Sequence, residues 1–208
     1  MASHIFDPAY YALDLGAPIS VEAKNFGHTP PGWTPKNTII TWEFAARGKM
    51  PPVTLKYYLG PDTPHPKIKH LEKDRLPKFM KQGSRAGGSF LVGEHASISA
   101  GEAGEDCRIM PEATMQATKK PPQVSYRRKS GHYSGTGHHL WNWTMAIKGE
   151  DKAMSHFGYA GPFSEMILLG DVAAMLPGRK LLWDSKNLRF SNDQEANKNT
   201  FIRRLAPR

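Results

Sequence analysis

The sequence predicts an α+β fold built on a largely antiparallel sheet, and three observations lead to that class. The chain carries 19 glycines and 17 prolines among its 208 residues, which favours many turns and a substantial β component. The predicted elements follow in the order helix, strands, long loops, helices, strands, whereas a doubly wound fold alternates strands with helices. No predicted strand leads into a Gly-x-Gly-x-x-Gly fingerprint, and the nearest match, residues 135–140, lacks the third glycine. We therefore expect no Rossmann domain in this chain.

The first segment, residues 3–16, has apolar residues at helical spacing and predicts a helix that ends at Gly16. Pro8 leaves two interpretations of how this helix begins, because proline cannot donate a hydrogen bond to the carbonyl of His4. Either Asp7 caps a helix that begins at Pro8, or the first turn is bent.

Alternation of apolar and polar residues, the pattern of a half-buried strand, recurs along the chain. It predicts three neighbouring antiparallel strands at 18–26, 38–46 and 53–59, the last two joined by a hairpin connection. Shorter strands are predicted at 88–93, 96–101, 181–184 and 188–190, with a brief edge segment at 108–112. Further helices are predicted at 138–148, at 163–176, where Pro162 suits a helix start, and at 192–200.

Two basic segments interrupt this pattern, an insertion-like region at 60–88, with a short helix at 71–81, and a loop at 119–137. They contribute to a formal charge of +9, but both lie among prolines and lack the interleaved aromatic residues that stack on bases. We interpret them as solvated loops and expect no nucleic-acid partner. No apolar run reaches the length of a membrane span, so we expect no membrane partner either. The single Cys107 excludes an intrachain disulfide, and no secretory signal is recognised, which leaves the compartment undecided.

One group of residues has the chemistry of a proton-handling site. His4, Asp7 and Tyr11 share one face of the first predicted helix, and a histidine beside a carboxylate can exchange protons near neutral pH. His139, at the start of a later helix beside Gly137, is either a ligand-facing residue or an ordinary first-turn histidine. The densest histidines, between residues 132 and 156, match no zinc spacing, so we expect no metal.

The later motifs resemble a known family. Residues 158–173 (GYAGPFSEMILLGDVA), followed by 180–184 (KLLWD) and 192–197 (NDQEAN), resemble the C-terminal end of bacterial Gfo/Idh/MocA oxidoreductases, which include glucose–fructose oxidoreductase and inositol dehydrogenase. Residues 47–53 and 88–94 are similar to the same subfamily. The resemblance runs through almost the whole chain.

The resemblance implies that residues 1–208 form a single C-terminal substrate-binding and oligomerisation domain. Its fold would resemble the C-terminal domain of glyceraldehyde-3-phosphate dehydrogenase, with a large open sheet and helices on one face. The substrate would be a sugar or polyol, and NAD or NADP would bind to a nucleotide domain elsewhere in the full-length protein. We expect this chain alone to bind no cofactor and to be inactive.

The resemblance also assigns roles to the first helix. His4 matches the acid–base histidine of the family's Asp-x-x-x-His segment, whose Asp would fall one position before Met1 and is absent here. Asp7 matches a later Asp that contacts substrate hydroxyls, and we add Tyr11 and His139 as substrate-binding candidates. A cytoplasmic or periplasmic location in a bacterium is implied, without a choice between them.

Three alternatives stay open. A non-catalytic carbohydrate-binding or assembly domain could share the fold, part of an NAD-dependent glycosidase could share the motifs, and a basic nucleic-acid module would explain the charge. For any of them, too few helices are predicted to cover the apolar sheet residues, so we expect a homo-oligomer through the sheet face. The residues expected on that open face are Ile19, Val21, Ile40, Trp42, Phe44, Leu55 and Tyr57.

Overall fold

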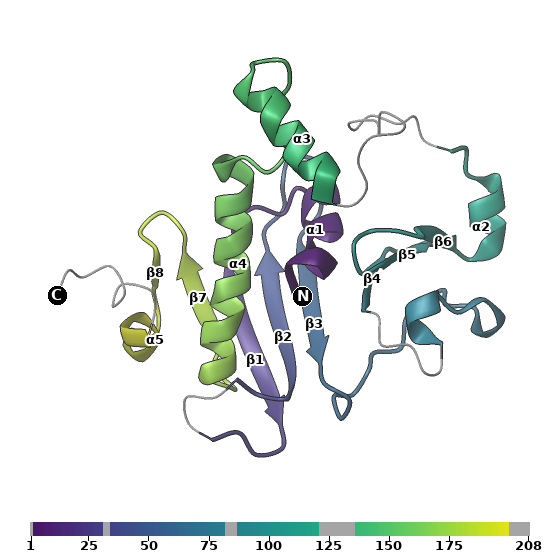
Figure 1. Cartoon of the computed structure of the whole chain (residues 1–208). Coiled ribbons are helices and arrows are strands. Elements are labelled where there is room, and N and C mark those ends of the chain that lie inside the picture. The colour runs from purple at the N-terminus through teal and green to yellow at the C-terminus, as the bar shows by residue number, and fades with distance from the viewer. Residues whose placement is uncertain (1, 31–33, 82–86, 121–135, 200–208) are drawn as a thin grey trace.

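The computed structural model describes residues 2–30, 34–81, 87–120 and 136–199, and it has an α+β fold (Figure 1). A five-stranded sheet has the order β3-β2-β1-β7-β8, and a three-stranded sheet has the order β4-β5-β6. Every strand pairing in both sheets of the described part is antiparallel. The predicted α+β class, with an open antiparallel sheet and helices packed against it, is confirmed.

The strands of the larger sheet are β1 (Ser20–Phe26), β2 (Asn37–Phe44), β3 (Val53–Leu59), β7 (Leu181–Asp184) and β8 (Arg189–Phe190). The smaller sheet contains β4 (Gly88–Val92), β5 (Ser97–Gly101) and β6 (Arg108–Met110). The helices are α1 (Ala2–Ala12), α2 (Glu112–Ala117), α3 (Thr136–Ile147), α4 (Phe157–Met175) and α5 (Gln194–Asn199). Two short 3₁₀ turns, η1 (Lys73–Arg75) and η2 (Lys78–Met80), stand where one helix was expected.

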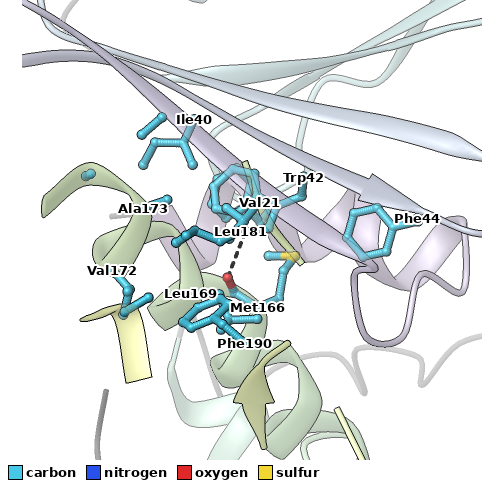
Figure 2. Close-up of a cluster of buried hydrophobic side chains, with 14 of the residues drawn as sticks. Val21, Ile40, Trp42, Phe44, Met166, Leu169, Val172, Ala173, Leu181 and Phe190 are labelled. Carbon is cyan, nitrogen blue, oxygen red and sulfur yellow. Dashed lines mark hydrogen bonds between the residues drawn. The ribbon is translucent and has the colours of Figure 1, made fainter. Parts of the chain in front are cut away.

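Alternate residues of β1 and β2 point toward α1 and α4 and form the core (Figure 2). Across the strands, Val21 pairs with Trp42, and Trp42 pairs with Leu55. Trp42 is 1% exposed, and its indole N–H donates to the carbonyl of Met166 in α4 at 2.9 Å. From α1, Phe6 meets Trp42 edge-on at a centroid distance of 5.3 Å. Trp42 therefore joins the sheet to both helices.

The sheet face predicted to be open and apolar is covered by helices. Of the seven residues expected on it, Val21, Ile40, Trp42 and Phe44 are buried, and Leu55 and Tyr57 pack against the same cluster. Ile19 alone of the seven is exposed, at 53%. The expectation was wrong because α1 and α4 both lie on this face. The opposite face mixes Ile39 and Tyr58 with polar residues, namely Glu22, Lys24, Thr41, Glu43, Thr54 and Lys56. A homo-oligomer stays a prediction, but the uncovered apolar face no longer supports it.

Helix α1 begins at Ala2 and continues through Pro8, so the interpretation in which Asp7 caps a helix that begins at Pro8 is wrong. The alternative, a bent first turn, stays a prediction. Asp7 lies inside the helix, so it is not an N-cap. Proline gives up one intrahelical bond here, but its ring packs toward the second sheet. A Cβ added to Gly104 would approach the Pro8 ring to 3.0 Å.

The end of α1 is a Schellman motif centred on Asp14 rather than a cap at Gly16. The Leu15 amide donates to the Tyr10 carbonyl at 3.2 Å, and the Asp14 amide donates to the Tyr11 carbonyl at 3.3 Å. Asp14 has a φ of 46°, the left-handed conformation that the motif requires. The sequence signal at Gly16 misplaced the cap because an aspartate can adopt this conformation too.

Helix α4 begins at Phe157, earlier than the start that Pro162 indicated. The amides of Tyr159 and Ala160 both donate to the carbonyl of His156 at 2.9 Å, so the first turn is complete before the proline. Pro162 removes only the donor to the Gly158 carbonyl, which the helix tolerates near its exposed start.

The insertion-like region 60–88 is attached to the smaller sheet. The Lys69 ammonium donates to the Glu94 carbonyl at 2.6 Å, and the Ser97 hydroxyl donates to the Lys69 carbonyl at 2.8 Å. The predicted basic loop 119–137 lies mostly outside the described residues. Within the described ranges, none of the helices has the length and apolar content needed to cross a membrane.

Candidate functional site

The candidate site is the face of α1 that neither sheet covers. One side of α1 buries Phe6 and Tyr10 in the main core, and another side places Pro8 against the smaller sheet. The 3.6-residue period leaves a third side for His4, Asp7 and Tyr11. All three are exposed, Tyr11 at 64%. The predicted grouping of these residues on one helix face is thus present.

Tyr159 of α4 completes this face and was not predicted. Its hydroxyl donates to Oδ1 of Asp7 at 2.5 Å across a separation of 152 residues. Its ring lies edge-on to Tyr11 at 5.9 Å and stacks on Phe163 at 6.0 Å. The hydrogen bond holds one carboxylate oxygen of Asp7, and no hydrogen bond from the described residues reaches the other, Oδ2.

Tyr159 and the buried Tyr10 are held in the protonated form. The pKa of Tyr159 lies well above its ordinary value, first because the phenol is partly buried and then because it donates to the Asp7 carboxylate. Burial, followed by the charges of Glu165 and Asp14, raises the pKa of Tyr10 to about 12. At neutral pH, Tyr159 is therefore a hydrogen-bond donor and not a base.

The two predicted histidines lie in different surroundings. His4 is exposed on the α1 face, and no hydrogen bond or ion pair joins it to the described residues. His139 is exposed on α3, and within the described ranges no hydrogen bond or ring contact connects it to His4, Asp7 or Tyr11. The structure therefore places Tyr159 in contact with Asp7 and Tyr11 on the exposed face of α1, which also carries His4. His139 lies on a separate helix, α3.

A surface pocket lies away from this face. It has a volume of about 630 Å³ and lies between the 3₁₀ turns and strands β5 and β6. Arg75, Lys78, Asp106 and Arg108 are among its lining residues, and Lys78 pairs with Asp106 at 2.7 Å. No group of three or more histidine, cysteine or acidic residues suited to a metal occurs in the described part of the chain.

The α1 face has the parts of a recognition site for hydroxyl-bearing ligands. A carboxylate with a free oxygen accepts hydroxyl hydrogen bonds, an exposed tyrosine ring offers a flat apolar surface, and a histidine can donate, accept or exchange a proton. The face is open to solvent, so these residues alone do not exclude water from a reacting group. The arrangement is compatible with the binding of such a ligand.

Comparisons with known proteins add no family to this description. Neither the protein-family models nor the curated proteins with which the sequence was compared gave a match.

Proposed function

We propose that this chain is the substrate-binding and oligomerisation domain of an NAD(P)-dependent oxidoreductase that acts on a sugar or polyol. In this proposal His4 exchanges a proton with a substrate hydroxyl, Asp7 accepts hydrogen bonds from neighbouring hydroxyls, and Tyr11 lies against the ring or chain carbons. His139 is included in this proposal as a more distant substrate contact. It lies on α3, and no hydrogen bond or ring contact among the described residues connects it to the α1 face.

The observation that carries the proposal is the hydrogen bond between Tyr159 and Asp7. It holds one oxygen of the Asp7 carboxylate, while Asp7 itself is exposed on this side of α1. A carboxylate held in one orientation on an exposed helix face is a preorganised acceptor for ligand hydroxyl groups. The motif resemblance at residues 158–173, which contains Tyr159, supports the same assignment.

The described residues do not fit a dinucleotide site. Both sheets lack parallel strand pairs in the described part, and no Gly-x-Gly-x-x-Gly stretch occurs in the sequence. The proposal therefore requires that NAD or NADP bind to a domain outside these 208 residues.

The open site favours one further candidate, a non-catalytic carbohydrate-binding or assembly domain. An exposed face is sufficient for recognition, whereas many catalytic sites also exclude water from the reacting groups. A glycosidase that uses NAD transiently would share the binding residues. The coding sequence upstream of residue 1 discriminates among these candidates, since both enzymes require a nucleotide domain and the binding module does not.

The binding assignment is testable on the chain itself by NMR titration with glucose, sorbitol and myo-inositol. We expect millimolar binding, with shifts confined to α1 and the first turn of α4. Asp7→Asn and Tyr11→Ala should abolish these shifts. Tyr159→Phe should weaken binding several-fold, because Tyr159 orients Asp7 although it does not itself contact the ligand. Glu22→Gln, a charge-matched change on the other face of the sheet, should leave binding unchanged. Shifts elsewhere, or equal effects from Asp7→Asn and Glu22→Gln, would exclude the α1 face.

The domain assignment is testable by calorimetric titration of the chain with NAD and NADP. Absence of binding is expected, because the nucleotide fingerprint is missing. Tight binding of either dinucleotide would show that the chain contains its own nucleotide site, and the assignment as a substrate domain would be wrong.

A further inference from the structure

Helix α3 carries an exposed apolar stripe. Leu140, Trp143 and Ile147 are 56%, 59% and 68% exposed, and their spacing of three and four residues places them on one side of the helix. A soluble surface helix normally turns such a stripe toward the core. Here the side facing the chain is formed by Trp141, Asn142 and Met145, none of which is exposed, so the apolar stripe faces solvent.

The helix is also uncharged. Residues 136–147 contain no Asp, Glu, Lys or Arg, although 23% of the chain is charged and twelve residues would on average carry about three such side chains. The exposed side chains flanking the stripe, His139 and Thr144, are polar, and the Thr144 hydroxyl already donates to the Leu140 carbonyl at 2.9 Å. This side of α3 presents neither repelling charges nor a free hydroxyl at that position.

The stripe is held in a fixed orientation from behind. Asn142, 6% exposed, donates to the Asp151 carboxylate and to the Lys152 carbonyl and accepts from the Met154 amide at 2.9 Å. These bonds tie α3 to the segment that leads into α4. Figure 1 shows α3 projecting beyond the end of the larger sheet.

We propose that this stripe is a dimer interface, in which α3 packs antiparallel against α3 of a second copy of this chain. Apolar residues at steps of three and four form the seam of paired helices. A surface without charges is complementary to itself, whereas the remainder of a chain with a net charge of +9 repels its own copy. Trp143 is the middle residue of the stripe, so a two-fold axis places it against its own counterpart.

The two-fold arrangement gives a specific test by analytical ultracentrifugation of the full chain. Wild type is expected to form a dimer in a concentration-dependent equilibrium. Trp143→Glu and Trp143→Lys should each weaken dimerisation by about 30-fold or more, because a central tryptophan is lost and like charges oppose each other. A one-to-one mixture of the two variants should restore a dimer, since the opposite charges then face each other.

Leu182→Glu is the matched control. Leu182 is 41% exposed on β7 and lies away from α3, so the dimer should persist in this variant. Far-ultraviolet circular dichroism should show unchanged folding in all variants, because Trp143 is mostly exposed. A monomeric wild type would overturn the proposal. It would equally be overturned by a dimer that Trp143→Glu leaves intact, by dissociation in Leu182→Glu only, or by two variants that do not recombine.

Discussion

Gly170 of α4 is the position where the packing of the fold can be tested most directly. A Cβ added there would lie 2.4 Å from Cζ2 of Trp42, 3.1 Å from Cη2 and 3.3 Å from Cε2. Carbon atoms in contact normally lie about 3.5–4.0 Å apart, so the Gly170→Ala methyl overlaps the indole ring by more than about 1 Å. The ring cannot move away freely, because its N–H is bonded to Met166 and its edge contacts Phe6.

Two opposing terms set the expected magnitude for Gly170→Ala. Replacing glycine by alanine inside a helix stabilises it by about 1 kcal/mol when the new methyl group is free. Overpacking a rigid core costs about 1–3 kcal/mol, and an overlap of this size lies at the upper end of that range. We therefore expect a net loss of about 2 kcal/mol in the free energy of unfolding, or a Tm lower by about 4–8 °C for a chain of this size.

The same change in a Trp42→Phe background separates the two terms. Phenylalanine lacks the indole atoms that the new methyl group would meet, so there Gly170→Ala should stabilise the protein by about 1 kcal/mol. The free energy of unfolding should be measured by urea titration with far-ultraviolet circular dichroism, because Trp42→Phe changes the tryptophan fluorescence. Equal destabilisation by Gly170→Ala in both backgrounds, or none in either, would refute the assigned contact.

The remaining predictions concern the ends and surroundings of α1. The buried hydroxyl of Tyr10 has no partner among the described residues, so Tyr10→Phe should raise the free energy of unfolding at pH 7 by about 1 kcal/mol in urea titrations. Because the pKa of Tyr10 is about 12 in the folded protein and about 10 in the unfolded chain, ionisation of this phenol makes the folded state less stable above pH 10 than below it. Wild type should lose about 2–3 kcal/mol between pH 10 and 12 that Tyr10→Phe does not lose, as measured by alkaline unfolding. Asp14→Gly should stabilise the protein by about 1 kcal/mol and Asp14→Ala should not, because only glycine adopts a φ of 46° without strain; thermal melts compare them. Arg47 donates to three carbonyls, including that of Leu13, so Arg47→Ala should cost about 2–3 kcal/mol, and Arg47→Lys, which lacks the planar fork, about 1–2 kcal/mol by urea midpoint.

Local periodicity was sufficient to predict the larger sheet. The strands expected at 18–26, 38–46 and 53–59 are observed at Ser20–Phe26, Asn37–Phe44 and Val53–Leu59, because one side of each faces the core and the alternation is strong. Coverage of that sheet was not predictable in the same way. It depends on where α1 and α4 pack, which is a property of the tertiary structure.

The candidate site shows the same division between local and long-range information. His4, Asp7 and Tyr11 could be grouped because their spacing is a property of one helix. Tyr159 could not, because it contacts Asp7 from 152 residues away and because Pro162 suggested that the helix begins after it. Tyr159 could have been included only if the helix had been predicted to begin before Pro162. In the structure it does so, because the His156 carbonyl accepts the first helical hydrogen bonds.

Helix α1 links the two sheets, and this determines what the candidate site depends on. Phe6 packs one side of the helix against Trp42 of the larger sheet. On another side, the segments that flank the strands of the smaller sheet approach closely. A Cβ added to Gly87 would lie 2.6 Å from Ile5, and one added to Gly104 would lie 3.0 Å from Pro8. The direction of the exposed face, and with it the Asp7 carboxylate, is therefore set by both sheets together. The insertion and the smaller sheet thus hold α1 in place, although none of their described residues belongs to the exposed face.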